Sequence, residues 1–104
     1  MVRVFHDKGI GLNRNYFGKQ DPKVSDLVLA AEVDTDDLEL AFQLTNHIDM
    51  DWWDNEGVTR YGGKRSTSCG DVMEKDGTFF VVASAGFRET ALKDYYAPLL
   101  SNSN

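Results

Sequence analysis

The feature that most constrains the fold is an Asp-Gly pair, Asp76-Gly77, set between two apolar segments. Asp-Gly readily adopts the positive φ angles of tight β-turns, so the pair predicts a chain reversal. Beyond it, apolar side chains recur at every second position, which is the spacing of one face of a strand. We therefore predict a β-hairpin from about Gly70 to Phe87, whose second strand, 78–87, is covered on at least one side. One face of that strand carries Phe79, Val81, Ala83, Ala85 and Phe87, and the other carries Phe80 and Val82.

The rest of the chain supplies shorter strands and two helices. Residues 36–47 place apolar side chains on one side of a helical wheel, and the aspartates at their start suit a helix N-terminus. Residues 89–96 predict a short last helix that ends before Pro98. The predicted class is α+β, with a small, mainly antiparallel sheet, one central amphipathic helix and a short C-terminal helix. Further strands are predicted at 2–6, 27–33 and 58–61.

A length of 104 residues suits a single domain. We assign residues 1–100 to that domain and expect 101–104, Ser-Asn-Ser-Asn, to be a disordered tail. Residues 7–23 are rich in Gly and Asn and form a long connection for so small a domain. They are therefore a candidate binding loop.

Cysteine content and hydropathy predict the compartment. The single cysteine, Cys69, cannot form an internal disulfide, so nothing marks an oxidising environment. The N-terminus lacks the apolar centre of a signal peptide, and no apolar run reaches the about 18 residues that a membrane span requires. We expect a cytoplasmic protein without membrane association.

Charge is concentrated in the middle third of the chain. The net charge is −6, yet residues 24–59 contain ten carboxylates and no Lys or Arg. Residues 1–23 carry five basic and two acidic side chains, and residues 60–104 carry six and five. An acidic protein is repelled by nucleic acid at long range and attracted by basic surfaces. The charge pattern therefore favours a protein partner with a basic surface and disfavours nucleic acid as a partner.

Few residues suit catalysis or metal binding. The histidines are His6 and His47. Either could in principle activate the thiol of Cys69, but a lone cysteine is more often a small buried side chain. The spacing of Cys and His matches no zinc site. A calcium loop starting at Asp49 would need Gly at its sixth position and Glu at its twelfth, but these positions hold Asp54 and Arg60. We expect no cofactor, no metal and no enzymatic activity.

One part of the chain is similar to a known group of proteins. Residues 65–72, Arg-Ser-Thr-Ser-Cys-Gly-Asp-Val, are followed by Asp-Gly-Thr-Phe-Phe at 76–80 and by Ala-Gly-Phe at 85–87. This order resembles small uncharacterised proteins encoded on bacteriophages and plasmids, which share an Arg-Ser-x-Ser-x-Gly-Asp-Val stretch, an Asp-Gly turn and a Gly-aromatic end. The resemblance covers about a quarter of the chain. It implies an accessory protein of a mobile element, with no established activity.

The acidic segment and a tryptophan pair together suggest partner binding. Trp52 and Trp53 lie among the carboxylates, and neighbours in an extended backbone point in opposite directions. One can then fill the core while the other contacts a partner. Our leading hypothesis is a non-enzymatic binding protein that engages a basic host or partner protein, as a DNA mimic does when it inhibits a nucleic-acid-binding or defence factor. The candidate partner-binding residues are Asp36, Asp37, Asp49, Asp51, Trp52, Trp53, Asp54 and Glu56.

The alternative hypothesis is a small nucleic-acid or nucleotide-binding module. Guanidinium, ammonium and hydroxyl donors all suit phosphate oxygens, and one compact group contains them. The same residues could instead balance nearby carboxylates or shape the entry to the hairpin. An enzyme using scattered carboxylates is a third hypothesis, and a homodimer formed through an exposed sheet edge stays open. The candidate phosphate-binding residues are Arg60, Lys64, Arg65, Ser66, Thr67 and Ser68.

Overall fold

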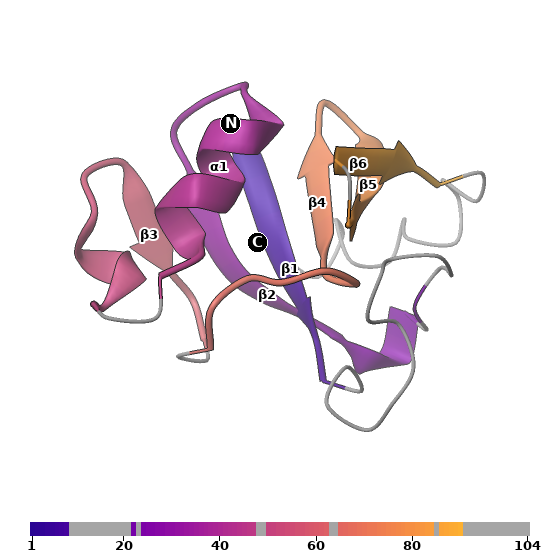
Figure 1. Cartoon of the computed structure of the whole chain (residues 1–104), viewed down its shortest axis with the longest axis horizontal. Coiled ribbons are helices and arrows are strands. Elements are labelled where there is room, and N and C mark those ends of the chain that lie inside the picture. The colour runs from indigo at the N-terminus through magenta and orange to yellow at the C-terminus, as the bar shows by residue number, and fades with distance from the viewer. Residues whose placement is uncertain (9–21, 23, 48–49, 63–64, 85, 91–104) are drawn as a thin grey trace.

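The computed structural model of the chain describes residues 1–8, 22, 24–47, 50–62, 65–84 and 86–90 (Figure 1). The strands are β1 (Val2–Asp7), β2 (Leu27–Val33), β3 (Val58–Arg60), β4 (Val72–Lys75), β5 (Thr78–Ala83) and β6 (Gly86–Glu89). The helices are α1 (Leu38–Thr45) and two 3₁₀ turns, η2 (Val24–Asp26) and η3 (Trp52–Asp54). The strands form one antiparallel sheet in the order β3-β2-β1-β4-β5-β6. Within the described residues, the predicted α+β class with an antiparallel sheet and a central helix is confirmed.

Strand β1 lies near the middle of the sheet, between β2 and β4, and its pairing with β2 contains a β-bulge. Val4 pairs with Ala31, but the next residue, Phe5, pairs with Leu29, which leaves Ala30 as the extra residue. Because side chains alternate between the two faces of a strand, the bulge sends Leu29 to the face opposite Ala31. The two residues would share a face in a regular strand.

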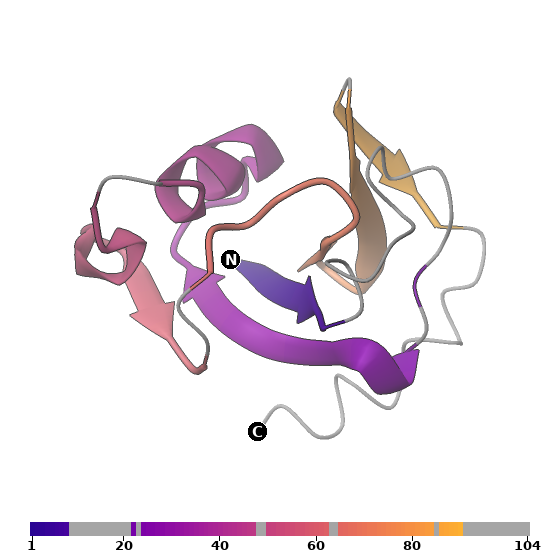
Figure 2. The same cartoon turned by 60° about the horizontal axis from the view of Figure 1, so that its bottom comes forward.

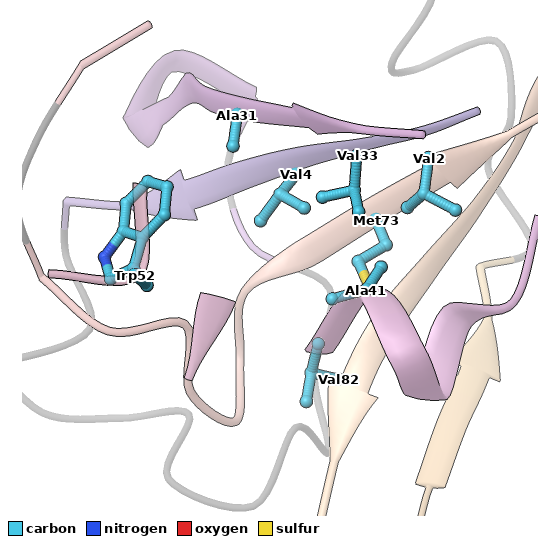
Figure 3. Close-up of a cluster of buried hydrophobic side chains, with 8 residues drawn as sticks. All are labelled: Val2, Val4, Ala31, Val33, Ala41, Trp52, Met73 and Val82. Atoms are coloured by element: carbon cyan, nitrogen blue, oxygen red, sulfur yellow. The ribbon is translucent and has the colours of Figure 1, made fainter. Parts of the chain in front are cut away.

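The sheet carries a buried apolar cluster on each face. Val72 and Met73 are neighbours in β4 but belong to different clusters, as side chains on opposite faces must. Full burial of one such side chain stabilises a fold by about 1.5–3 kcal/mol, so the two clusters supply much of the stability. The cluster beneath α1 and η3 comprises Val2, Val4, Ala31, Val33, Ala41, Trp52, Met73 and Val82 (Figure 3). The other comprises Phe5, Leu27, Val72, Phe79 and Val81.

Helix α1 begins at Leu38, two residues later than predicted, and one of the predicted helix-starting aspartates, Asp37, precedes it. The side chain of Asp37 accepts hydrogen bonds from the backbone N–H groups of Glu39, at 2.9 Å, and Leu40, at 3.4 Å. These bonds satisfy two of the amide groups that the first turn leaves without an intrahelical acceptor. The helix ends at Thr45, two residues earlier than predicted, and buries Ala41 and Thr45 against the sheet.

The Asp-Gly turn is confirmed, but the long strand predicted after it is wrong. Asp76 and Gly77 have φ angles of 53° and 84°, and β4 and β5 pair across them. The second strand stops at Ala83, which pairs with Gly86, so the chain reverses and returns as β6. Gly86 has a φ angle of 126°, which non-glycine residues rarely adopt. The apolar alternation continues through the reversal, which is why it reads as one strand.

Strand β6 also corrects the predicted last helix. Glu89, its predicted first residue, is the last residue of β6, and the backbone N–H of Thr90 still donates to the carbonyl of Phe79 at 2.9 Å. Residues 91–104, with the rest of that helix and the predicted tail, lie outside the described residues, as does most of the predicted binding loop. Strand β3 ends at Arg60, one residue earlier than predicted. Within the described ranges, no helix has the length and hydropathy needed to span a membrane.

Candidate functional site

Helix α1, the segment before it and the η3–β3 connection lie side by side. The backbone N–H of Asp34 donates to the carbonyl of Gly57 at 2.8 Å, and the side-chain amide of Asn55 donates to the carbonyl of Leu44 at 2.8 Å. The first bond extends the β2–β3 pairing by one residue, and the second reaches the last turn of α1, so the connection is joined to both the sheet and the helix. Figure 1 shows α1, η3 and β3 together on one side of the molecule, with β4, β5 and β6 on the other.

Exposed carboxylates gather on this side, and we call them the acidic end. Of the predicted partner-binding acids, Asp49 lies outside the described residues and the others are exposed. Asp36 pairs with the amino group of Met1 at 2.6 Å, and that hydrogen bond lowers the pKa of its carboxyl. Asp37 caps α1. The acidic end comprises Asp34, Asp36, Asp37, Glu39, Asp51, Asp54 and Glu56.

Two exposed apolar side chains accompany these carboxylates. Leu40 of α1 is 40% exposed, and Met50, just before η3, is 49% exposed. Buried apolar contact combined with surrounding charge is the usual composition of a protein interface. The side of the molecule that carries the charge therefore also carries apolar contact area.

The two tryptophans differ in burial, but they lie in the 3₁₀ turn η3 and not in the extended backbone that the prediction assumed. Trp52 is 1% exposed, and its indole N–H donates to the carbonyl of Arg65 at 3.0 Å. Its predicted role in contacting a partner is therefore wrong, because it is part of the core (Figure 3). Trp53 is half-buried, meets Trp52 edge-on at 5.3 Å between ring centroids, and lies under the guanidinium of Arg60 at 4.6 Å.

The basic residue at the centre of the predicted phosphate site, Arg65, pairs with a buried carboxylate. Its two terminal nitrogens donate to the two oxygens of Asp71 at 2.7 and 2.8 Å. These hydrogen bonds raise the pKa of Arg65. Asp71 is fully buried and also accepts from the backbone N–H groups of Asp7 and Ser68, both at 2.8 Å. This carboxylate thereby joins β1 to the segment that precedes β4.

That segment, residues 65–71, is called the strap here, and it crosses β1 on the face that carries α1 (Figure 2). Its hydrogen bonds hold the end of the helix. The backbone N–H of Thr67 donates to the carbonyl of Thr45 at 2.9 Å, and the side chain of Asn46 donates to the carbonyl of Thr67. The hydroxyl of Ser66 donates to the carbonyl of His47 at 2.5 Å. The strap is therefore a structural connection between helix and sheet.

His6 is buried beneath the strap. Its Nε2 atom shares a hydrogen bond with the hydroxyl of Thr67 at 2.9 Å, and its ring meets Trp52 edge-on. Burial lowers the pKa of His6 to about 4, with Arg65 acting in the same direction and Asp71 against it. The imidazole is thus neutral near pH 7. Thr67 is fully buried, so this hydroxyl–histidine pair is closed to a substrate.

The structure does not bring the predicted phosphate ligands together as free donors. Arg65, Ser66 and Thr67 have hydrogen-bond partners within the fold, while Arg60 lies over Trp53. The Ser68 hydroxyl accepts from Arg65 at 3.2 Å. Lys64 lies outside the described residues. Phosphate binding by this group stays a prediction, and it would have to compete with these internal bonds.

Sequence reasoning missed two sets of internally paired residues. One set contains Asp71, which the sequence analysis names only within the Gly-Asp-Val stretch. It lies just before an apolar strand and six residues after Arg65, and this spacing allows an ion pair between the two side chains. The other set joins three strands and the residue after β3: Arg3 pairs with Glu32 and Glu74, both at 3.1 Å, and Tyr61 donates to Glu32 at 2.7 Å. Only the strand register brings these side chains together.

Metal and thiol chemistry receive no support from the described ranges. They contain no group of three or more His, Cys, Asp or Glu residues placed to hold a metal ion. Cys69 lies in the strap, is half-buried and forms no disulfide. The resemblance to phage and plasmid proteins stays a prediction, because the chain matches no protein-family model and no curated protein or solved structure is similar to it.

Proposed function

We propose that the protein is a non-enzymatic binding protein whose acidic end engages a basic surface of a partner protein. The observation that carries the proposal is that the η3–β3 connection is hydrogen-bonded both to Asp34, which follows β2, and to Leu44 in the last turn of α1. It places carboxylates from two separate parts of the sequence on one side of the molecule. A partner can contact both segments at once.

The charges of the acidic end are available to a partner because the fold makes little use of them. Among the described residues, Asp37 is engaged as a helix cap and Asp36 in an ion pair. Asp51, Asp54 and Glu56 are exposed on and beside η3. Clustered charge of one sign accelerates and selects the encounter with a surface of opposite sign.

The partner that best fits this surface is a nucleic-acid-binding protein. Such proteins present Lys and Arg to successive phosphates, and a row of carboxylates offers comparable charge on a folded support. In this proposal the protein is an accessory protein of a mobile element that occupies the nucleic-acid site of a host factor. Leu40 and Met50 would add apolar contact that nucleic acid does not provide.

Charge reversal tests the proposal. The protein is used to recover partners, and affinity for the purified partner is then measured at rising salt. Replacing Asp51, Asp54 and Glu56 by Lys should weaken binding by at least about tenfold and flatten its salt dependence, because opposite charges are replaced by like charges. The matched single variants are Asp54→Lys and Glu89→Lys, the second of which changes an exposed carboxylate of β6, at the other edge of the sheet.

Three outcomes would contradict the proposal. One is that no partner is recovered. Another is that the triple reversal leaves the affinity unchanged. The third is that Glu89→Lys weakens binding as much as Asp54→Lys does, because net charge alone would then explain the effect. A labelled oligonucleotide serves as the comparison ligand, and we expect no binding to it because of the net charge of −6.

A further inference from the structure

The guanidinium group of Arg60 lies on the ring of Trp53, beside the acidic end. The guanidinium carbon of Arg60 is 4.6 Å from the centre of the Trp53 ring. Arg60 is exposed on the edge strand β3, and Trp53 is half-buried. A guanidinium at this distance from a Trp ring makes a cation–π interaction, for which Trp is the best aromatic partner and Arg the commonest cation. Arg60 thus partly covers a tryptophan that could otherwise contact another molecule.

The Trp53 ring, which Arg60 covers, is supported by buried neighbours. Trp53 packs edge-on against Trp52, and Trp52 is anchored by its hydrogen bond to the strap at Arg65. The exposed carboxylates of Asp54 and Glu56 stand one and three residues along the chain from Trp53. A preorganised aromatic surface next to negative charge is suited to bind a guanidinium group.

We infer that Arg60 occupies, within the free protein, the place that an arginine of a basic partner takes on Trp53 when it binds. Arg60 and the arginine of the partner then compete for one aromatic face. This inference rests on the proposed function and names the side chain of the partner that the acidic end receives. It also makes Arg60, which the sequence suggested as a phosphate ligand, a residue that lowers the affinity for the partner.

Competition makes a specific prediction about removal of Arg60. Replacing it by Gln keeps much of the side-chain length but removes the charge, so Trp53 becomes free for an incoming arginine. An exposed cation–π contact changes a binding constant by about two- to fivefold. Arg60→Gln should therefore tighten binding of an arginine-rich peptide by about that factor beyond the effect of net charge.

The experiment uses a fluorescein-labelled hexa-arginine peptide and the full chain, with affinity read from fluorescence anisotropy. Lys8→Gln is the matched control, because Lys8 is exposed at the end of β1 and its loss changes net charge by the same amount. Trp53→Leu removes the aromatic face and keeps an apolar side chain against Trp52. We expect Trp53→Leu to weaken binding about two- to fivefold, and Arg60→Gln to match Lys8→Gln when both are made in the Trp53→Leu background.

A hexa-lysine peptide adds a second measurement. Arg binds aromatic faces better than Lys does, so the wild-type protein should prefer hexa-arginine, and Trp53→Leu should remove that preference. Circular dichroism confirms that each variant is folded. A folded Trp53→Leu variant that keeps both the affinity and the arginine preference would overturn the inference.

The inference and the proposed function fail in different ways. If Arg60→Gln behaves like Lys8→Gln or weakens binding, Arg60 does not compete and the inference is wrong. If Asp54→Lys weakens peptide binding more than Glu89→Lys does in that case, the proposed function stands. If the wild-type protein does not bind hexa-arginine at all, the inference is overturned, and the proposed function is judged by its own partner experiment.

Discussion

The strap and the acidic end both contain charged residues, but the fold treats them in opposite ways. In the strap, Asp71 is fully buried and accepts hydrogen bonds from Arg65 and from two backbone N–H groups. At the acidic end, carboxylates such as Asp54 and Glu56 are exposed. A buried charge is costly unless it is fully paired, whereas an exposed charge costs little and contributes little to stability. Buried charge therefore identifies architecture here, and exposed charge identifies the surface available to partners.

The largest effect in this comparison is expected from Asp71→Ala. The substitution leaves Arg65 and the backbone N–H groups of Asp7 and Ser68 without their acceptor beneath the strap. Breaking such a buried pair typically costs about 3–5 kcal/mol. Urea denaturation measures the loss, and Asp54→Ala is the control that should stay close to wild type. A loss below about 1 kcal/mol would mean that the Asp71 network is dispensable.

The next effect is a dependence of stability on pH through His6. Its pKa is about 4 in the folded protein and near 6.5 when unfolded, so between these values the unfolded chain binds the proton. Stability should therefore fall as the pH drops from 6.5 towards 4, by up to about 3 kcal/mol for this group. Asp71 and Arg65 are the charged groups that act on it.

Substitution of the histidine isolates its contribution from that of the carboxylates, which also titrate near pH 4. His6→Gln keeps a hydrogen-bonding side chain beside Thr67 but cannot titrate. Unfolding free energies of both proteins are compared by urea denaturation at pH 7, 5.5 and 4. We expect the wild-type protein to lose more stability than His6→Gln across this range. Parallel curves would show that His6 is not buried in its neutral form.

A smaller loss of stability is expected from Asp37, a carboxylate of the acidic end that caps α1. Asp37→Ala removes the cap of α1 and should cost about 1 kcal/mol. Asp36→Ala is the matched variant one residue earlier, and its effect should be clearly smaller because its ion pair is solvent-exposed. Thermal unfolding followed by circular dichroism measures both. Equal losses would mean that the cap geometry does not matter.

The smallest effect on stability is expected from neutralising the exposed acids of η3 and its connection. Asp54→Asn and Glu56→Gln should each change the free energy of unfolding by less than about 0.5 kcal/mol, since these side chains have no described partner in the fold. The same variants should reduce the affinity for the basic partner and the slope of its salt dependence. Stability loss without a change in affinity would assign these residues to architecture.

Much of the fold could be predicted because the signals are local. Asp76-Gly77 turns the chain, Asp37 starts the helix, and apolar spacing identifies the strands. The break at Ala83 could not be predicted in the same way, because the apolar alternation of β5 continues into β6. The exposure of the acids at the acidic end could also be predicted, because charged side chains favour solvent. The spacing of Arg65 and Asp71 makes their pairing possible, but the burial of Asp71 beneath the strap depends on contacts with β1.

By itself, the sequence determined the turn, the helix start, the strand-forming segments and the excess of negative charge in residues 24–59, since each depends on residues close together in the chain. Only the tertiary structure decided that Trp52 is buried while Trp53 lies under Arg60, and that Arg65 is held by Asp71. These outcomes depend on strand register, on the bulge at Ala30 and on the path of the strap. Contacts between distant parts of the chain therefore decide which side chains pair, where the local sequence allows several pairings.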